Sequence, residues 1–107
     1  MDRRFWVVEG RELDFEIAFA GTWKDFLRQA SGYLGTEVEC ESQTERRYRV
    51  RDFWLGHRDF EMFRERFAPE YERFESLIRS NGLVEREHFV GAYYEKGPGE
   101  EDELVPG

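Results

Sequence analysis

The chain has 107 residues, enough for one domain with a modest core, and hydrophobic residues make up 39% of it. Its formal net charge of −8 argues against a nucleic-acid binder, because phosphate neutralisation requires clustered Lys and Arg. No apolar run approaches the roughly 20 residues that span a bilayer, and no secretory signal opens the chain. We therefore expect a cytoplasmic protein without a membrane partner.

The first predicted elements are a strand and a helical region. Residues 4–8 form a bulky, partly β-branched apolar run that predicts a strand. From residue 11 the apolar side chains recur at helical spacing until Gly21 interrupts the pattern. Thr22 followed by Asp25 resembles a capping box, so the helix is predicted to break in two at this point.

Two alternating segments, 33–40 and 47–54, then predict a β-hairpin. We expect Glu39 to face Arg47, so that opposite charges form a ladder across the two strands. The arginines of the second segment then belong to this ladder or, alternatively, to an anion-binding surface. The lone cysteine, Cys40, fits a small core residue better than a nucleophile.

A long amphipathic helix and a further strand complete the pattern. Aromatic and aliphatic residues recur at helical steps over 59–80, where Pro69 predicts either a kink or a restart. Residues 87–95 read as a fourth strand. We expect one domain over 1–96, while the acidic, Gly- and Pro-containing segment 97–107 predicts a disordered tail.

This order of elements predicts an α+β fold of the ferredoxin-like type, β-α-β-β-α-β. Its two helices would cover one face of a four-stranded sheet. The other face has no cover within the chain, although the exposed face of an antiparallel sheet must be solvated or covered. We therefore expect a homodimer formed through the sheet faces.

Three segments carry a family resemblance: Tyr33-Leu34-Gly35-Thr36-Glu37, Asp52-Phe53-Trp54, and the helix from Phe60 to Tyr71. Together they resemble the antibiotic biosynthesis monooxygenase family, part of the dimeric α+β barrel superfamily, over residues 5–95. The resemblance implies two sheets packed into a barrel across a dimer, with a pocket in each subunit. Family members include cofactor-free monooxygenases of aromatic polyketides and quinols, and haem-degrading enzymes.

The sequence departs from both catalytic patterns of that family. Trp54 matches a tryptophan that ends the third strand in polyketide-oxidising and haem-degrading members. Val50 replaces an Asn of the polyketide enzymes, and Phe60 replaces their Tyr. The first-strand Asn of the haem degraders corresponds to Arg3 or Arg4, and their helical His has no counterpart, so haem degradation is disfavoured.

A cofactor-free oxygenase needs a water-poor pocket, a base and a group that stabilises an anion. Trp54 offers a flat wall and an indole donor, while Asp52 and His88 are candidate bases. Each of the three also has a structural interpretation. Trp54 could simply fill the core, Asp52 could cap the next helix or pair with an Arg, and His88 could be a hydrogen-bonded structural residue. Four residues are candidates for lining the substrate pocket: Tyr71, Phe60, Phe63 and His57.

The sequence predicts no cofactor and no metal, because it has neither a Gly-rich phosphate loop nor His and Cys at metal-ligand spacing. Fold alone does not determine function. The favoured hypothesis is a small-ligand-binding homodimer. The alternatives are a cofactor-independent monooxygenase acting on a small aromatic or quinol-type substrate, and a purely structural homodimer.

Overall fold

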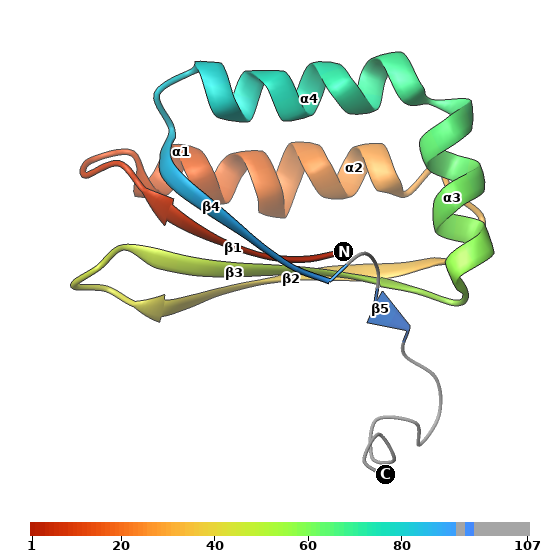
Figure 1. Cartoon of the computed structure of the whole chain (residues 1–107), viewed down its shortest axis with the longest axis horizontal. Helices are drawn as coiled ribbons and strands as arrows, with labels where there is room; N and C mark the ends of the chain where they lie inside the picture. The colour runs from red at the N-terminus through yellow and green to blue at the C-terminus, as the bar shows by residue number, and fades with distance from the viewer. Residues whose placement is uncertain (92–93, 96–107) are drawn as a thin grey trace, which may run out of the picture.

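A computed structural model describes residues 1–91 and 94–95, which form an α+β fold with helices on one face of a mainly antiparallel sheet (Figure 1). The strands are β1 (Asp2–Val7), β2 (Tyr33–Ser42), β3 (Arg47–Trp54), β4 (Val84–Gly91) and β5 (Tyr94–Glu95). The strand order is β2-β3-β1-β4, and the short β5 pairs in parallel with the end of β3. This arrangement is compatible with the predicted ferredoxin-like fold. The predicted tail, 97–107, lies outside the described residues.

The first helical region consists of α1 (Glu12–Ile17), a π-helical segment (Ala18–Thr22) and α2 (Trp23–Leu27), without the predicted break. Thr22 has helical dihedrals and makes no capping hydrogen bond, so its predicted role as an N-cap is wrong. The fully buried residues of this region recur at every fourth position: Phe15, Phe19, Trp23 and Leu27. Such a row drifts around an α-helix of 3.6 residues per turn, and the wider π-helical turn offsets the drift.

Pro69 marks the start of a new helix, which confirms the restart rather than the kink. The chain forms α3 (His57–Arg66) and α4 (Ala68–Ser80), with Pro69 in the first turn of α4. The missing N–H of proline removes no intrahelical hydrogen bond at that position. Figure 1 shows α3 closing one end of the sheet, while α4 runs beside α1 and α2. None of the described helices is long and apolar enough to cross a membrane.

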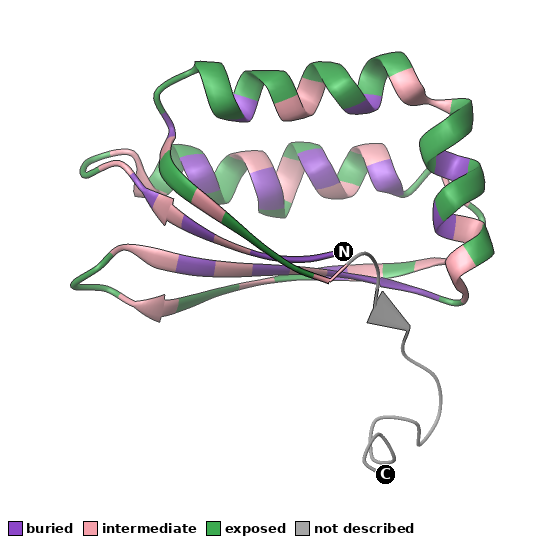
Figure 2. Cartoon of the chain, viewed as in Figure 1, coloured by how far each residue is buried: buried purple, intermediate pink, exposed green. Residues whose placement is uncertain are grey.

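The core lies between the sheet and the helices (Figure 2). Phe5 and Val7 of β1 and Val50 of β3 face the helices and are at most 1% exposed. Aromatic rings fill the space above them, and Trp23 lies with its ring centroid 4.7 Å from that of Phe74 on α4. The core is therefore rich in aromatic residues, and it packs α2 and α4 over β1 and β3.

The hairpin register differs from the prediction by two residues. Glu39 lies opposite Arg49, and Glu37 lies opposite Arg51. The predicted charge ladder is confirmed, since Arg51 Nη2 lies 3.0 Å from Glu37 Oε1 and 3.5 Å from Glu39 Oε1. Further along the open face, Arg49 donates two hydrogen bonds to the Asp2 carboxylate, at 3.0 and 2.7 Å. The arginine run thus forms ion pairs within the chain.

Cys40 is exposed, so the prediction of a core cysteine is wrong. It lies on the edge strand β2 opposite Tyr48, next to an irregularity in the pairing between Cys40 and Ser42. There the hydroxyl of Tyr48 donates to Glu16 of α1 at 3.1 Å. Cys40 thus lies beside a polar contact between the sheet and α1.

Candidate functional site

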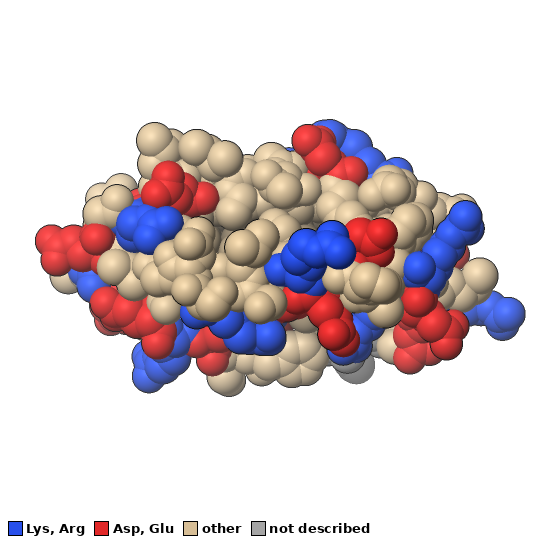
Figure 3. Space-filling model, turned by 90° about the horizontal axis from the view of Figure 1, so that it is seen from above, with Lys and Arg blue, Asp and Glu red and all other residues tan. Residues whose placement is uncertain are grey.

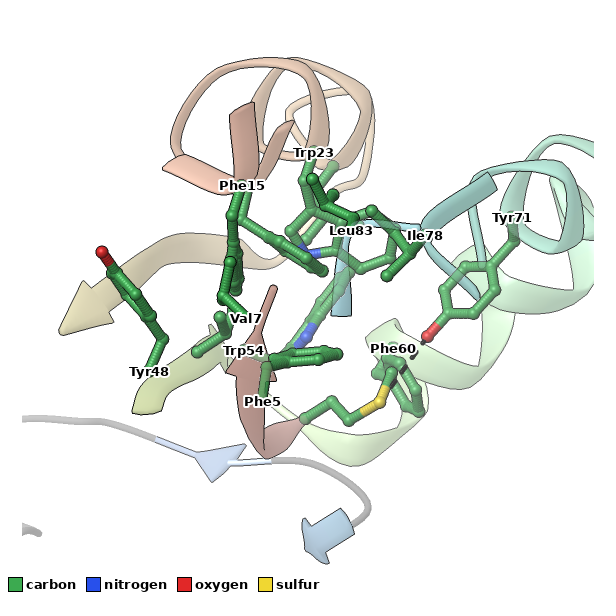
Figure 4. Packing of buried hydrophobic residues seen from close by; sticks show 14 of the residues in the cluster. Phe5, Val7, Phe15, Trp23, Tyr48, Trp54, Phe60, Tyr71, Ile78 and Leu83 are labelled. Carbon is green, nitrogen blue, oxygen red and sulfur yellow. Dashed lines mark hydrogen bonds between the residues drawn. The ribbon is translucent and has the colours of Figure 1, made fainter. Parts of the chain in front are cut away.

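Trp54 ends β3 between the sheet and α3, where it is fully buried. Its ring packs at centroid distances of 5.5 Å from Tyr33, 5.5 Å from Phe60 and 5.9 Å from Phe63 (Figure 4). The indole Nε1–H has no hydrogen-bond partner among the described residues. Trp54 is therefore a central core residue that retains one uncompensated donor.

Asp52 lies on the same face of β3 and is 1% exposed. Its Oδ1 accepts hydrogen bonds from Trp23 Nε1 at 2.9 Å and from the Thr36 hydroxyl at 2.7 Å. The Tyr33 hydroxyl in turn lies 2.5 Å from the Thr36 hydroxyl oxygen. This network holds β2, β3 and α2 together. The Asp52 carboxylate is thus committed to structural hydrogen bonds.

The two histidines do not join Asp52 and Trp54. His88 lies opposite Arg4 on β4, and directly paired residues of an antiparallel sheet share one face, here the open face. His57 is the first residue of α3, where its Nε2 lies 2.8 Å from Glu61 Oε2 on the helix surface. In the structure His88 and the two β3 residues therefore lie on opposite faces of the sheet and do not share a cavity.

A pocket of about 680 Å³ lies between β1, β4, α3 and α4. Two of the predicted pocket residues, Phe60 of α3 and Tyr71 of α4, line it together with Met1 of the chain start and Phe89 of β4. The Tyr71 ring is 4% exposed, and Figure 4 shows its hydroxyl reaching from α4 toward Phe60. The contact that this hydroxyl makes is with the Met1 sulfur at 4.0 Å, and a thioether is a weak acceptor.

Phe63, the third aromatic candidate, lies on a different surface of α3. It lines a second pocket of about 520 Å³ together with Ala30, Met62 and Phe67. Neither pocket is lined by Trp54 or Asp52. The predicted site residues are thus divided among the core, two pockets, the open sheet face and the surface of α3, and of these residues only Tyr71 and Phe60 share a cavity.

The sequence interpretation missed Arg3, which lines the first pocket with a side chain only 3% exposed. Its Nη1 lies 2.8 Å from Glu75 Oε1 and 3.3 Å from Glu87 Oε2. Burial opposes the charge, but attraction to Glu75 and Asp52 outweighs it, so the pKa of Arg3 lies above its ordinary value. Arg3, Phe5 and Val7 are two residues apart in the sequence and therefore share one face of β1, and this spacing could have placed the Arg3 charge on the inner face.

The remaining ionisable groups of the pocket wall differ in how they are paired. Arg79 lies 3.5 Å from Glu75 and 3.8 Å from Glu87, so these carboxylates share two arginines. Arg64 lies 5.5 Å above the Tyr71 ring. Burial raises the pKa of Tyr71 well above its ordinary value, so its phenol stays a hydrogen-bond donor at neutral pH.

Neither the surface charge nor the metal-binding residue types point to a different kind of site in the described part of the chain. Figure 3 shows the helix-covered side with basic and acidic side chains interspersed, rather than gathered into one large patch of either sign. Within the described part of the chain, no three His, Cys, Asp or Glu side chains are placed to bind a metal ion. The pocket beside Tyr71 is therefore the candidate site.

The comparisons with known proteins bear on the fold. The chain is similar to protein SO0527 from Shewanella oneidensis, whose crystal structure matches with a TM-score of 0.56 at 20% sequence identity, over 81% of each chain. No family model matches the sequence, and none of the curated proteins does. The likeness to SO0527 supports the α+β fold alone, and the resemblance to the antibiotic biosynthesis monooxygenases stays a prediction.

Proposed function

We propose that this protein binds a small, largely apolar ligand in the pocket between β4 and α4. The observation that carries the proposal is the pocket of about 680 Å³ with the Tyr71 hydroxyl on its wall. Small-molecule sites typically combine apolar side chains with fixed polar groups, and this pocket joins four apolar or aromatic side chains to six charged residues and Ser76. Met1, Phe60 and Phe89 would contact the body of the ligand, and the Tyr71 hydroxyl would donate to one of its oxygens.

Binding is favoured over catalysis because the carboxylates near the pocket that are withdrawn from water are already engaged, while Glu72, the remaining carboxylate of the wall, is exposed. The Asp52 carboxylate accepts from Trp23 and Thr36, and Glu75 and Glu87 are paired with arginines. One observation favours the alternative, a cofactor-independent monooxygenase. The buried Trp54 indole retains an uncompensated donor, the kind of group that stabilises a developing anion, but it lines neither pocket, and the monooxygenase therefore stays the second candidate.

The binding proposal is tested by titrating the protein with small aromatic alcohols, phenols and quinols in a calorimeter. We expect Tyr71→Phe to weaken binding about five-fold, because a neutral hydrogen bond contributes about 1 kcal/mol. Tyr48→Phe is the matched control, since it removes a hydroxyl on the other side of the core that bonds to Glu16. Equal losses in both variants, or no binding of any compound at millimolar concentration, would contradict the proposal. Substrate-dependent dioxygen uptake would instead support the monooxygenase.

We further propose that two copies pack through their open sheet faces, as in the antibiotic biosynthesis monooxygenase-like dimeric barrel. His88 of β4 is exposed opposite Arg4, and Trp6 of β1 lies on the same open face beneath Arg86, 3.8 Å from ring centroid to guanidinium carbon. Both side chains would be covered by a two-fold partner, which presents the same surface.

Light scattering at micromolar concentration tests this dimer. We expect the wild type to have twice the mass of one chain, and Trp6→Glu to have the mass of one chain, because it places a charge inside the interface. Leu77→Glu, on the exposed side of α4, makes the same kind of substitution away from the open face and is expected to leave the dimer intact. A monomeric wild type would rule out the dimer.

A further inference from the structure

Some of the charged side chains that line the Tyr71 pocket form ion pairs with one another, and others do not. Arg3 and Arg79 neutralise Glu75 and Glu87 through contacts of 2.8 to 3.8 Å. Two charged residues of the wall remain outside this network: Arg64 of α3 and Glu72 of α4. Among the described residues neither forms an ion pair, so one cation and one anion on the pocket wall have no opposite charge paired with them there.

Arg64 is held in position by the aromatic wall. Its guanidinium carbon lies 5.5 Å above the centroid of the Tyr71 ring, a distance at which a cation is attracted to the ring face. The planar guanidinium is also suited to two parallel hydrogen bonds with a carboxylate. Glu72 follows Tyr71 directly on α4 and offers an acceptor to a cationic group.

These two charges select between head groups. A ligand with a carboxylate alone is attracted by Arg64 and repelled by Glu72. A ligand with an ammonium group alone is attracted by Glu72 and repelled by Arg64. A ligand with both groups satisfies both residues without changing the net charge of the pocket. Its apolar body fits against Met1, Phe60 and Phe89, and the buried Tyr71 hydroxyl lies within the same cavity as a further donor.

We propose that the ligand is an apolar or aromatic zwitterion of the amino-acid type, with its carboxylate on Arg64 and its ammonium on Glu72. This inference rests on the binding function proposed above. It adds the class of ligand and assigns specificity to two residues on the pocket wall.

Four ligands of one shape test the inference: phenylalanine, 3-phenylpropionate, phenethylamine and 3-phenylpropanol. We expect phenylalanine to bind most tightly in calorimetric titrations. Arg64→Gln is expected to weaken phenylalanine and phenylpropionate two- to five-fold, the range of a solvent-exposed ion pair, and to spare phenethylamine. Glu72→Gln is expected to weaken phenylalanine and phenethylamine and to spare phenylpropionate.

Arg58→Gln and Glu65→Gln remove the same charges from α3 outside the pocket and are expected to change none of the four affinities. Equal affinity for phenylalanine and the neutral phenylpropanol, or losses that do not follow the charge of the ligand, would overturn the zwitterion while leaving the binding function in place. Absence of binding by all four compounds, together with the phenols and quinols tested above, would overturn both.

Discussion

Replacing Trp54 with alanine is expected to lower the free energy of unfolding by about 3–5 kcal/mol, the usual range for truncating a buried Trp. The side chain is fully buried, and its ring packs against Tyr33, Phe60 and Phe63. These neighbours come from β2 and α3, so the cavity would form where the sheet meets the closing helix. Because the surrounding elements relax only partly, the loss exceeds the transfer free energy of the indole.

Urea unfolding followed by far-UV circular dichroism measures this loss without relying on the tryptophan signal. Leu55→Ala serves as the control, since Leu55 follows Trp54 directly in the chain and is 65% exposed. We expect the control to lose much less stability than Trp54→Ala. An unchanged unfolding midpoint for Trp54→Ala would contradict the core assignment and restore Trp54 as the wall of a ligand pocket.

Alternation along β3 predicted its buried face correctly, because burial on one face of a strand has a period of two. Tyr48, Val50, Asp52 and Trp54 are all at most 5% exposed. The hairpin register was less determined by the sequence. Shifting the pairing by two residues keeps every side chain on its face and still places Glu opposite Arg, so neither polarity nor charge distinguishes the two registers.

The observed register goes with a turn that is held by a contact with a remote strand. Arg46 adopts a positive φ of 55°, and its Nε donates to the Val7 carbonyl at 2.9 Å. This contact joins the hairpin end to β1, which is remote in the sequence. The helix break predicted at Gly21 failed for a similar reason, since packing of the aromatic row against the sheet outweighed the local preference of glycine.

The candidate site could be predicted only in part. The helical period placed Tyr71 and Phe60 on the buried side of their helices, and both line the pocket. The period could not show that Phe63, one turn after Phe60 on α3, lies beside Ala30 and lines a second pocket. Nor could alternation alone assign His88 to a face, because charged residues precede it on both faces of β4, Arg86 opposite Trp6 and Glu87 opposite Phe5.

The second large effect is expected from the buried ion pair between Arg3 and Glu75. The Arg3 guanidinium carbon lies 5.1 Å from the ring centroid of Phe5 and 5.7 Å from that of Trp23, which leaves it little access to water. Removing one partner of a buried pair leaves an uncompensated charge, at a cost of about 3–5 kcal/mol. Since Glu87 still lies 3.3 Å from Arg3, we expect Glu75→Ala to fall at the lower end of that range.

The double variant Arg3→Met with Glu75→Leu separates charge from packing. Replacing both members of a buried pair with apolar residues of similar size is often neutral or stabilising, so the double variant is expected to unfold near the wild-type urea concentration. Glu70→Ala, an exposed position in the first turn of α4, controls for loss of a helical carboxylate. If Glu75→Ala costs no more than Glu70→Ala, Arg3 is solvated in solution and the pocket floor is open to water. A strongly destabilised double variant would show instead that the ion pair itself positions α4 over β1, and with it the wall that carries Tyr71.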